Sequence, residues 1–186
     1  MNNSPSRSFD ITLMGATGFV GALTADYLAA KAPADVRVAL AGRNQTKLEA
    51  LRKQLTAKHP RAKEFPLVIA DSSDNRSLEK LARDTRVVIS TVGPYYRYGF
   101  PLVRECATHG THYVDLAGEP LFMRESADSY HDIATASGAR IIHACGFDSV
   151  PSGLGMLLLG QRASENKDTL ETATMIVKMK GGLSGG

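Results

Sequence analysis

One stretch near the beginning of the chain, residues 11–25 (ITLMGATGFVGALTA), limits the possible folds more than any other. An apolar strand leads through three glycines, Gly15, Gly18 and Gly21, into a helix. Gly15 can make the tight turn, Gly18 lets a pyrophosphate approach the backbone, and Gly21 lets the helix pack on the sheet. The free N–H groups at the start of the helix also suit an anion. The stretch predicts a dinucleotide-phosphate site, although its spacing is G-x-x-G-x-x-G and an ordinary strand-to-helix turn would also produce it.

The rest of the chain alternates apolar strands with helical segments. Further strands are expected at residues 36–42, 67–70, 86–92, 112–116 and 139–144. The strand at 86–92 is almost uniformly apolar, which is typical of a parallel strand buried on both faces. The alternation predicts the α/β fold class, with a doubly wound parallel sheet of the Rossmann type that binds its ligands at the carboxyl ends of the strands.

Composition and charge exclude several classes of partner. With 43% hydrophobic and 22% charged residues, the 186-residue chain is typical of a soluble globular protein with one sizeable core. The net charge is only +3 and the basic residues are scattered, so no nucleic-acid partner is expected. Cys106 and Cys145 stand far apart without a C-x-x-C pair, which favours a reducing cytoplasm and no metal site.

The two ends of the chain differ in kind from its middle. Residues 1–8 are polar and are expected to form a disordered tail, not a signal peptide. The apolar run 154–159 (LGMLLL) is too short to cross a membrane, so no transmembrane segment is expected, and we predict a buried helix there. In residues 172–180 apolar and polar residues alternate, as in a strand with one solvent-exposed face, and the glycine-rich segment 181–186 follows.

The alternating segment 172–180 bears on the domain organisation. A single strand has no obvious partner after six strands have completed a sheet. We therefore predict a Rossmann domain over residues 9–164 and, over residues 165–186, the first strand of a truncated second α+β domain. The alternative is that the segment forms an extra edge strand of the same sheet.

The end of the second expected strand distinguishes NADP from NAD. Proteins that bind NAD place an acid there for the ribose 2′-hydroxyl, whereas this chain has Arg43, 22 residues beyond Gly21. Asn44 and Lys47 follow it. A planar guanidinium can bind a 2′-phosphate through two hydrogen bonds and can stack on adenine. A solvated surface cation is the alternative, but the position of Arg43 favours NADP as the cofactor.

The later strand ends supply further expected contacts. Asp71 and Ser72 follow the third strand and could bind adenine or cap a helix. Gly93 would let the backbone approach the nicotinamide ribose, and Pro94 would stiffen that turn. The predicted cofactor-binding residues are Gly15, Thr17, Gly18, Phe19, Val20, Gly21, Arg43, Asn44, Lys47, Asp71, Ser72, Val92, Gly93, Pro94, Tyr95 and Phe147.

Five motifs carry a resemblance to a known family. They are GATGFVG at 15–21, AGR at 41–43, GPY at 93–95, YVDLAGE at 113–119 and CGFDSVPSG at 145–153. In this order, over roughly residues 9–186, the chain resembles the saccharopine dehydrogenase-like oxidoreductases, which include the trans-acting enoyl reductases of lipid biosynthesis. The last two motifs are more specific than the glycine turn. One departure is Gly153, where many relatives carry an acid.

The resemblance implies an amino-terminal NADP-binding domain followed by a larger α+β domain. Residues 165–186 would then begin a substrate and dimerisation domain, and the full-length protein would be a homodimer. Hydride would pass between NADPH and a small-molecule substrate, either an imine or an enoyl, lipid-type compound. The chain alone is expected to bind the cofactor without turnover. The alternative function is a non-catalytic NADP-binding sensor or interaction module.

Three candidate catalytic residues, Asp148, Asp115 and Tyr95, follow strand ends, and Glu119 is considered together with Asp115; each has a plain alternative. Asp148, after the sixth strand, could position the carboxamide or a substrate group, or form an Asx-turn. Asp115 and Glu119, after the fifth strand, could serve a substrate amine or a proton relay, or be solvated at the surface. Tyr95 belongs to a group of three phenols within residues 95–98 that could form a pocket wall or an exposed loop.

Two residues of the sixth strand region are expected to be structural. His143 is expected to be a core histidine with its hydrogen bonds satisfied. Cys145 would need an activating base and a helix N-terminus to act as a nucleophile, so a packing role is favoured for it.

Overall fold

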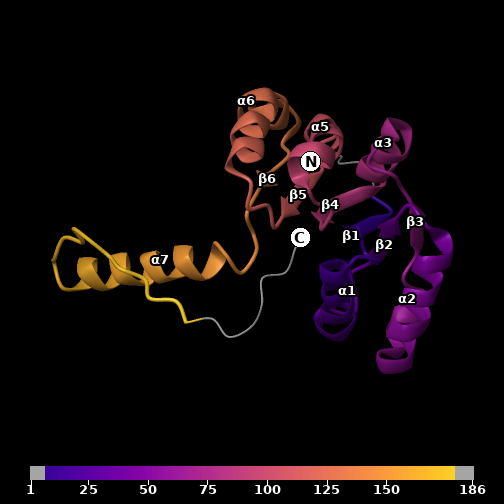
Figure 1. Cartoon of the computed structure of the whole chain (residues 1–186), viewed down its shortest axis with the longest axis horizontal. Coiled ribbons are helices and arrows are strands. Elements are labelled where there is room, and N and C mark those ends of the chain that lie inside the picture. The colour runs from indigo at the N-terminus through magenta and orange to yellow at the C-terminus, as the bar shows by residue number, and fades with distance from the viewer. Residues whose placement is uncertain (1–6, 179–186) are drawn as a thin grey trace.

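The computed structural model describes residues 7–178, and a six-stranded parallel sheet lies at its centre (Figure 1). The strands are β1 (Phe9–Met14), β2 (Val38–Gly42), β3 (Leu67–Ile69), β4 (Thr85–Ser90), β5 (His112–Asp115) and β6 (Ile141–Ile142). Their order in the sheet is β3-β2-β1-β4-β5-β6, and every neighbouring pair is parallel. The chain moves outward from β1 to β3, returns past β1 to β4, and then moves outward in the other direction. The predicted doubly wound sheet is confirmed.

Helices connect the strands and lie on both faces of the sheet (Figure 1). They are α1 (Phe19–Lys31), α2 (Gln45–Lys58), α3 (Asn75–Asp84), α4 (Tyr95–Tyr98), α5 (Phe100–Thr108), α6 (Pro120–Ser137) and α7 (Val150–Glu165), with a 3-10 turn η1 (Pro60–Glu64) after α2. Helices α1 and α2 lie on one face, and α3, α5 and α6 lie on the other. Each face has its own hydrophobic core. The core under α1 and α2 contains Leu13 and Leu40, and the core under α3, α5 and α6 contains Tyr113 and Phe122.

One row of side chains crosses all six strands on the face of α1 and α2. From β3 to β6 it consists of Leu67, Leu40, Leu13, Ile89, Val114 and Ile142. Leu40 and Leu13 are fully buried beneath the two helices, whereas Ile142 is 51% exposed. Within residues 7–178, burial on this face therefore declines from β1 towards β6.

The edge strand β6 is shorter than the sequence predicts, because a turn begins directly after it. The expected strand covers residues 139–144, but only Ile141–Ile142 pairs with β5. Ala144 has a positive φ of 57°, and its N–H donates to the side chain of Asp115. That conformation carries the chain out of the sheet.

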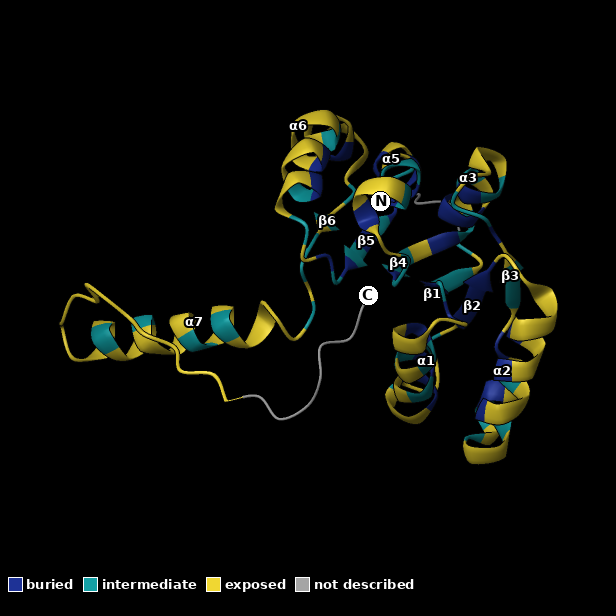
Figure 2. Cartoon of the chain, in the orientation of Figure 1, coloured by how far each residue is buried: buried dark blue, intermediate teal, exposed yellow. Residues whose placement is uncertain are grey.

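Helix α7 forms where the apolar run 154–159 predicts a helix, but the prediction that it is buried is wrong. It extends away from the main body (Figures 1 and 2), and none of its residues is buried. Leu157 and Leu158 are 55% and 64% exposed. An apolar run indicates a helix, but it does not say whether another element covers that helix.

The segment after α7 also differs from the prediction. Residues 172–178 have no regular secondary structure, so the strand expected over 172–180 does not form in the part of it that the structure describes. Residues 179–186, which include the glycine-rich ending, lie outside the described range. A strand needs a neighbour that accepts and donates its backbone hydrogen bonds, and this segment pairs with no strand of the sheet.

The segment before β1 is anchored at Arg7. Of the expected tail at residues 1–8, residues 1–6 lie outside the described range. The Arg7 guanidinium donates to the carbonyls of Ala82 and His109, which joins the start of the chain to α3 and α5. Between residues 7 and 178, no helix is long and apolar enough to cross a membrane, and no His, Cys, Asp and Glu side chains cluster as a metal site would require.

Candidate functional site

A pocket of about 280 Å³ opens at the carboxyl edge of the sheet, where the winding direction reverses between β1 and β4. Eight predicted cofactor-binding residues line it: Gly15, Thr17, Gly18, Arg43, Asp71, Ser72, Val92 and Gly93. Five further lining residues are absent from the predicted set: Met14, Gly42, Ala70, Thr91 and Tyr98. In a doubly wound sheet, this reversal point is where ligands bind.

The glycine turn between β1 and α1 is packed so closely that two of its positions exclude any side chain. Gly15 has a positive φ of 85°, and a Cβ there would lie 2.8 Å from both Thr91 Oγ1 and Val92 Cγ2. A Cβ at Gly21 would lie 2.1 Å from the Gly15 carbonyl oxygen. Gly18 differs, because the nearest atom to a Cβ there is 3.4 Å away. The absence of a side chain at Gly18 therefore leaves open space on the pocket side of the turn.

The start of α1 presents backbone amides and no negative charge at the pocket. Gly18 is the N-cap, and the first turn of α1 contains no acidic residue. The amides of Phe19, Val20 and Gly21 have no acceptor within the helix, because the first such bond runs from Ala22 N to Gly18 O at 2.8 Å. The Phe19 and Val20 side chains are exposed and do not line the pocket. An anion would therefore meet the backbone of these residues.

The end of β2 brings a cation to the pocket. Arg43 is exposed, lines the pocket, and forms no ion pair within the described part of the chain. Asn44 caps α2, with its Oδ1 accepting the Lys47 amide at 2.9 Å. Neither Asn44 nor Lys47 lines the pocket. Of the three residues predicted here, only Arg43 lines the pocket.

Asp71 stands opposite Arg43 at the end of β3. Its Oδ1 accepts the Ser73 amide at 2.9 Å and the Ser73 hydroxyl at 2.7 Å. These bonds, with a smaller contribution from the charge of Arg43, hold the pKa of the Asp71 carboxyl below its usual value. Asp71 is thus ionised at neutral pH, and its carboxylate shapes the turn into α3.

The loop after β4 is tied to the glycine turn. The Thr91 amide donates to Met14 O at 3.0 Å, and its hydroxyl lies 3.1 Å from the same oxygen. The Gly93–Pro94 peptide bond is cis, and Pro94 directly precedes α4. Helix α4 then brings Tyr98 to the pocket. Tyr98 is one of the three phenols expected to form a pocket wall, and Thr91 lies two residues before the GPY motif, an adjacency that could have included it among the predicted contacts.

Tyr95 does not face the pocket, which corrects its predicted role as a catalytic and cofactor-binding side chain. Its hydroxyl donates to Ser90 O at 3.0 Å, and its ring packs against Phe122 with a centroid distance of 5.8 Å. The residue is only 6% exposed, and burial raises the pKa of the phenol to about 12. The Tyr95 phenol therefore lies in the core and does not line this pocket.

Asp115 is also turned inward and does not line the pocket, so its predicted role toward a substrate or in a proton relay stays a prediction. Its Oδ1 accepts the amides of Ala117 and Ala144, each at 3.0 Å. Its Oδ2 lies 2.7 Å from His143 Nδ1, and its side chain has no exposed surface. The carboxylate therefore fixes the turn that follows β6 and the orientation of the His143 ring.

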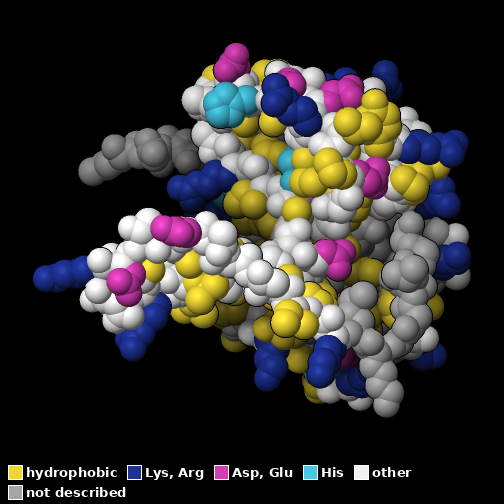
Figure 3. Space-filling view, turned by 60° about the vertical axis from the view of Figure 1, so that its left-hand side comes forward, with side chains coloured by type: hydrophobic (Ala, Val, Ile, Leu, Met, Phe, Trp, Pro, Cys, Tyr) yellow, Lys and Arg dark blue, Asp and Glu magenta, His cyan; other side chains and the backbone are white. Residues whose placement is uncertain are grey.

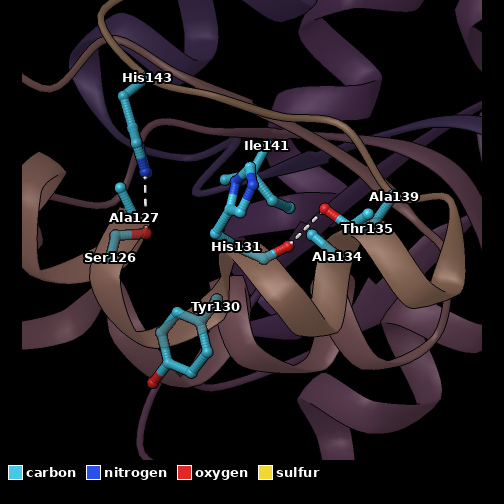
Figure 4. Close-up of a pocket in the computed structure, with 9 residues that line it drawn as sticks. All are labelled: Ser126, Ala127, Tyr130, His131, Ala134, Thr135, Ala139, Ile141 and His143. Atoms are coloured by element: carbon cyan, nitrogen blue, oxygen red, sulfur yellow. Dashed lines mark hydrogen bonds between the residues drawn. The ribbon is translucent and has the colours of Figure 1, made fainter.

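His143 is a core histidine with both ring nitrogens satisfied, as expected. Beyond its contact with Asp115, its Nε2 lies 2.9 Å from Ser126 Oγ (Figure 4). With Nδ1 donating to Asp115, a neutral ring accepts the Ser126 hydroxyl at Nε2. The ring borders a second cavity of about 190 Å³ between α6 and β6, which is separate from the pocket at the glycine turn.

The turn between β6 and α7 lies in solvent. Phe147 is 77% exposed and Asp148 is exposed, and neither lines the pocket. The predicted roles of Asp148 and Phe147 therefore stay predictions. Cys145 is exposed rather than packed, and desolvation together with the charge of Asp115 raises the pKa of its thiol. A raised thiol pKa disfavours a nucleophilic role.

Glu119 is the residue whose role was least visible in the sequence. Its Oε1 accepts the Tyr95 amide at 2.6 Å and its Oε2 accepts the Tyr96 amide at 2.9 Å. Glu119 precedes α6, yet its side chain caps α4, which follows a different strand. No pattern of local spacing could indicate a contact between two loops 23 residues apart.

Comparison with known proteins shows which family this chain is similar to. A family model described as the saccharopine dehydrogenase NADP binding domain matches residues 11–142. A putative trans-acting enoyl reductase of Mycobacterium tuberculosis is 50% identical over 182 residues, covering 97% of this chain and 42% of the relative. A trans-acting enoyl reductase of Mycobacterium leprae is 51% identical over 161 residues, covering 87% of this chain and 38% of the relative. The chain spans about two fifths of the length of these curated relatives.

Solved structures share the fold at low identity. Apo saccharopine dehydrogenase (L-Glu forming) from Saccharomyces cerevisiae superimposes with a TM-score of 0.67 at 22% identity, over 84% of this chain and 32% of that one. The Citrobacter sp. triphenylmethane reductase complexed with NADP(H) gives a TM-score of 0.52 at 19% identity, over 72% of this chain and 48% of that one. At these identities the likeness concerns the fold alone.

Proposed function

Because this chain belongs to the saccharopine dehydrogenase NADP-binding domain family, we propose that it is the cofactor-binding part of an NADP-dependent oxidoreductase. The observation that carries this proposal is the convergence of the glycine turn, Arg43 and the loop Thr91–Gly93 on one pocket at the reversal point of the sheet. Fold alone would not be enough, because the same fold serves many functions. The chemistry of the lining is what favours a phosphorylated dinucleotide.

The residues present fit that cofactor. The space at Gly18 and the free amides at the start of α1 suit the pyrophosphate. Arg43 suits the 2′-phosphate, and Asp71 and Ser72, which line the same pocket, would face the adenine. When bound, NADPH supplies a hydride. The residues of this chain bind and orient the cofactor, and Gly93 leaves the backbone after β4 open to the nicotinamide ribose.

For the substrate, we favour an enoyl, lipid-type compound over an imine. The relatives near 50% identity are named enoyl reductases, whereas the saccharopine dehydrogenase structure is only 22% identical. We further propose that residues 165–186 begin a substrate and dimerisation domain, and that the full-length protein works as a homodimer in the cytoplasm. Both cysteines are free, which suits a reducing compartment.

A non-catalytic NADP-binding sensor is the second candidate, and one observation favours it. Two of the three candidate catalytic side chains, Tyr95 and Asp115, point into the core. The experiment that separates the two functions measures NADPH oxidation by the full-length protein with α,β-unsaturated acyl thioesters and with imines. Oxidation that depends on the enoyl substrate supports the reductase. Cofactor binding without oxidation of NADPH by any substrate of the panel supports the sensor.

A further inference from the structure

We propose that Glu119 is a positioning residue that holds the segment Gly93–Tyr98 in the shape required by the nicotinamide half of the cofactor. The inference rests on the proposed NADP binding. Its basis is the pair of hydrogen bonds from the Tyr95 and Tyr96 amides to the two oxygens of the Glu119 carboxylate, at 2.6 and 2.9 Å. Each carboxylate oxygen accepts a hydrogen bond from one amide. Two such bonds fix the orientation of the loop relative to Glu119 as well as its distance from that residue.

The two amides need a partner because they begin a helix. Amides in the first turn of a helix have no acceptor within it. Pro94, the N-cap of α4, has no side-chain group that could accept them, and no side chain of its own loop caps the helix. A carboxylate at this end satisfies both donors and also interacts favourably with the helix dipole. Glu119, in the β5–α6 connection, thus supplies the hydrogen-bond acceptors that the residues next to α4 do not provide.

Fixing the start of α4 fixes its end, since the helix is a single turn. The Tyr98 amide donates to Pro94 O at 3.1 Å, and Tyr98 lines the pocket. Gly93, which directly precedes Pro94, lines the same pocket. Both pocket residues are therefore within one turn of the amides that Glu119 holds. They lie on the β4 side of the reversal point, opposite the side of Arg43.

The connection between β5 and α6 also holds the loop that follows β6, the other neighbour of β5. Asp115, four residues before Glu119, accepts the Ala144 amide after β6. The two acids of the motif YVDLAGE thus hold the loops that follow both neighbours of β5. Glu119 is half-buried, whereas Asp115 is buried, so Glu119 is the one of the two that can be replaced with less damage to the core.

The test compares two ligands on the 186-residue chain and on its Glu119→Ala and Glu119→Gln variants. Isothermal titration with NADPH reports the whole cofactor. Titration with adenosine 2′,5′-bisphosphate reports the adenine half, which has no nicotinamide. We expect Glu119→Ala to weaken NADPH binding about tenfold, the effect of one charge-assisted hydrogen bond, with bisphosphate affinity unchanged. Glu119→Gln keeps one acceptor and should fall between the wild type and Glu119→Ala.

Two further variants control the comparison. Glu79→Ala removes a partly exposed carboxylate of α3 that pairs with Arg83 and lies 3.9 Å from His109 Nε2, away from the pocket, and it should leave both affinities unchanged. Arg43→Ala should weaken both ligands, because each carries a 2′-phosphate. Hydrogen exchange gives a readout independent of ligand, since the Tyr95 and Tyr96 amides should exchange faster in Glu119→Ala than in the wild type.

Each outcome decides the question. Selective loss of NADPH affinity with faster exchange at Tyr95 and Tyr96 supports the proposal. Equal loss for both ligands would make Glu119 a general structural residue, and unchanged NADPH affinity would remove its role altogether. If the Glu119→Ala chain does not fold, the same comparison is made with Glu119→Gln. Failure of the wild type to bind either ligand would overturn the proposed function and not only the role of Glu119.

Discussion

At the residue scale, two tyrosines of one core show how differently buried hydroxyls can be placed. Tyr95 and Tyr113 belong to the same hydrophobic cluster. The Tyr95 hydroxyl donates to Ser90 O at 3.0 Å, whereas the buried Tyr113 hydroxyl lies near the Ser90 and Asp115 side chains without a hydrogen bond of good geometry among the described residues. A satisfied buried hydroxyl contributes about 1 kcal/mol to stability, and an unsatisfied one costs stability.

The two hydroxyls lead to opposite predictions for the same substitution. Tyr95→Phe should lower the free energy of unfolding by about 1 kcal/mol, because Ser90 O loses its donor. Tyr113→Phe should leave that free energy unchanged or raise it, because its hydroxyl forms no hydrogen bond of good geometry and the substitution removes a poorly paired buried polar atom. Urea unfolding of both variants measures the difference. A larger loss for Tyr113→Phe than for Tyr95→Phe would show that the hydroxyl of Tyr113 is paired.

At the element scale, alternation of strands and helices was enough to predict the sheet and its reversal point. The glycine turn, Arg43 and the ends of β3 and β4 line one pocket because each follows a strand and strand ends meet at one edge, while their contacts with a cofactor stay predictions. The directions of Tyr95 and Asp115 could not be predicted in this way. Long-range partners decide them, namely Phe122 for Tyr95 and His143 for Asp115.

The β1–α1 unit yields a prediction that separates a packing glycine from a binding glycine. Gly21→Ala should destabilise the chain by about 3 kcal/mol, because its Cβ would lie 2.1 Å from the Gly15 carbonyl oxygen. Gly18→Val should keep the fold, because its Cβ would make only an ordinary contact at 3.4 Å with the Gly15 carbonyl oxygen, but its branches fill the space proposed for the pyrophosphate. Thermal melts with and without NADPH measure both effects. An intact Gly18→Val chain that still gains stability from NADPH would place the phosphate site elsewhere.

At the scale of the whole molecule, an uncovered apolar helix lies beside an incompletely covered sheet. Helix α7 has no buried residue, and the row across the sheet ends at the exposed Ile142 (Figure 2). In Figure 3, which brings the α7 side forward, hydrophobic side chains are visible on this face. Apolar surface of this extent is typical of a face that contacts another protein surface. The apolar run alone predicted burial, but within residues 7–178 no element buries any residue of this helix.

This surface predicts self-association of the chain. Sedimentation velocity should show species larger than a monomer that increase with protein concentration. The double substitution Leu157→Gln and Leu158→Gln should reduce them, because these side chains are 55% and 64% exposed and their replacement leaves the sheet untouched. A wild-type chain that remains monomeric across the concentration range would contradict the prediction.

NADP binding at the reversal point of the sheet is the central proposal, and the preference of the chain for NADPH over NADH is its sharpest test. The measurement is isothermal titration of the wild-type chain and of Arg43→Ala with NADPH and with NADH. We expect the wild type to favour NADPH by on the order of 1.5–3 kcal/mol, the range for hydrogen bonds to a charged group. Arg43→Ala should narrow that difference by weakening NADPH alone. Equal affinity of the wild type for NADPH and NADH, or an unchanged preference in Arg43→Ala, would contradict the account.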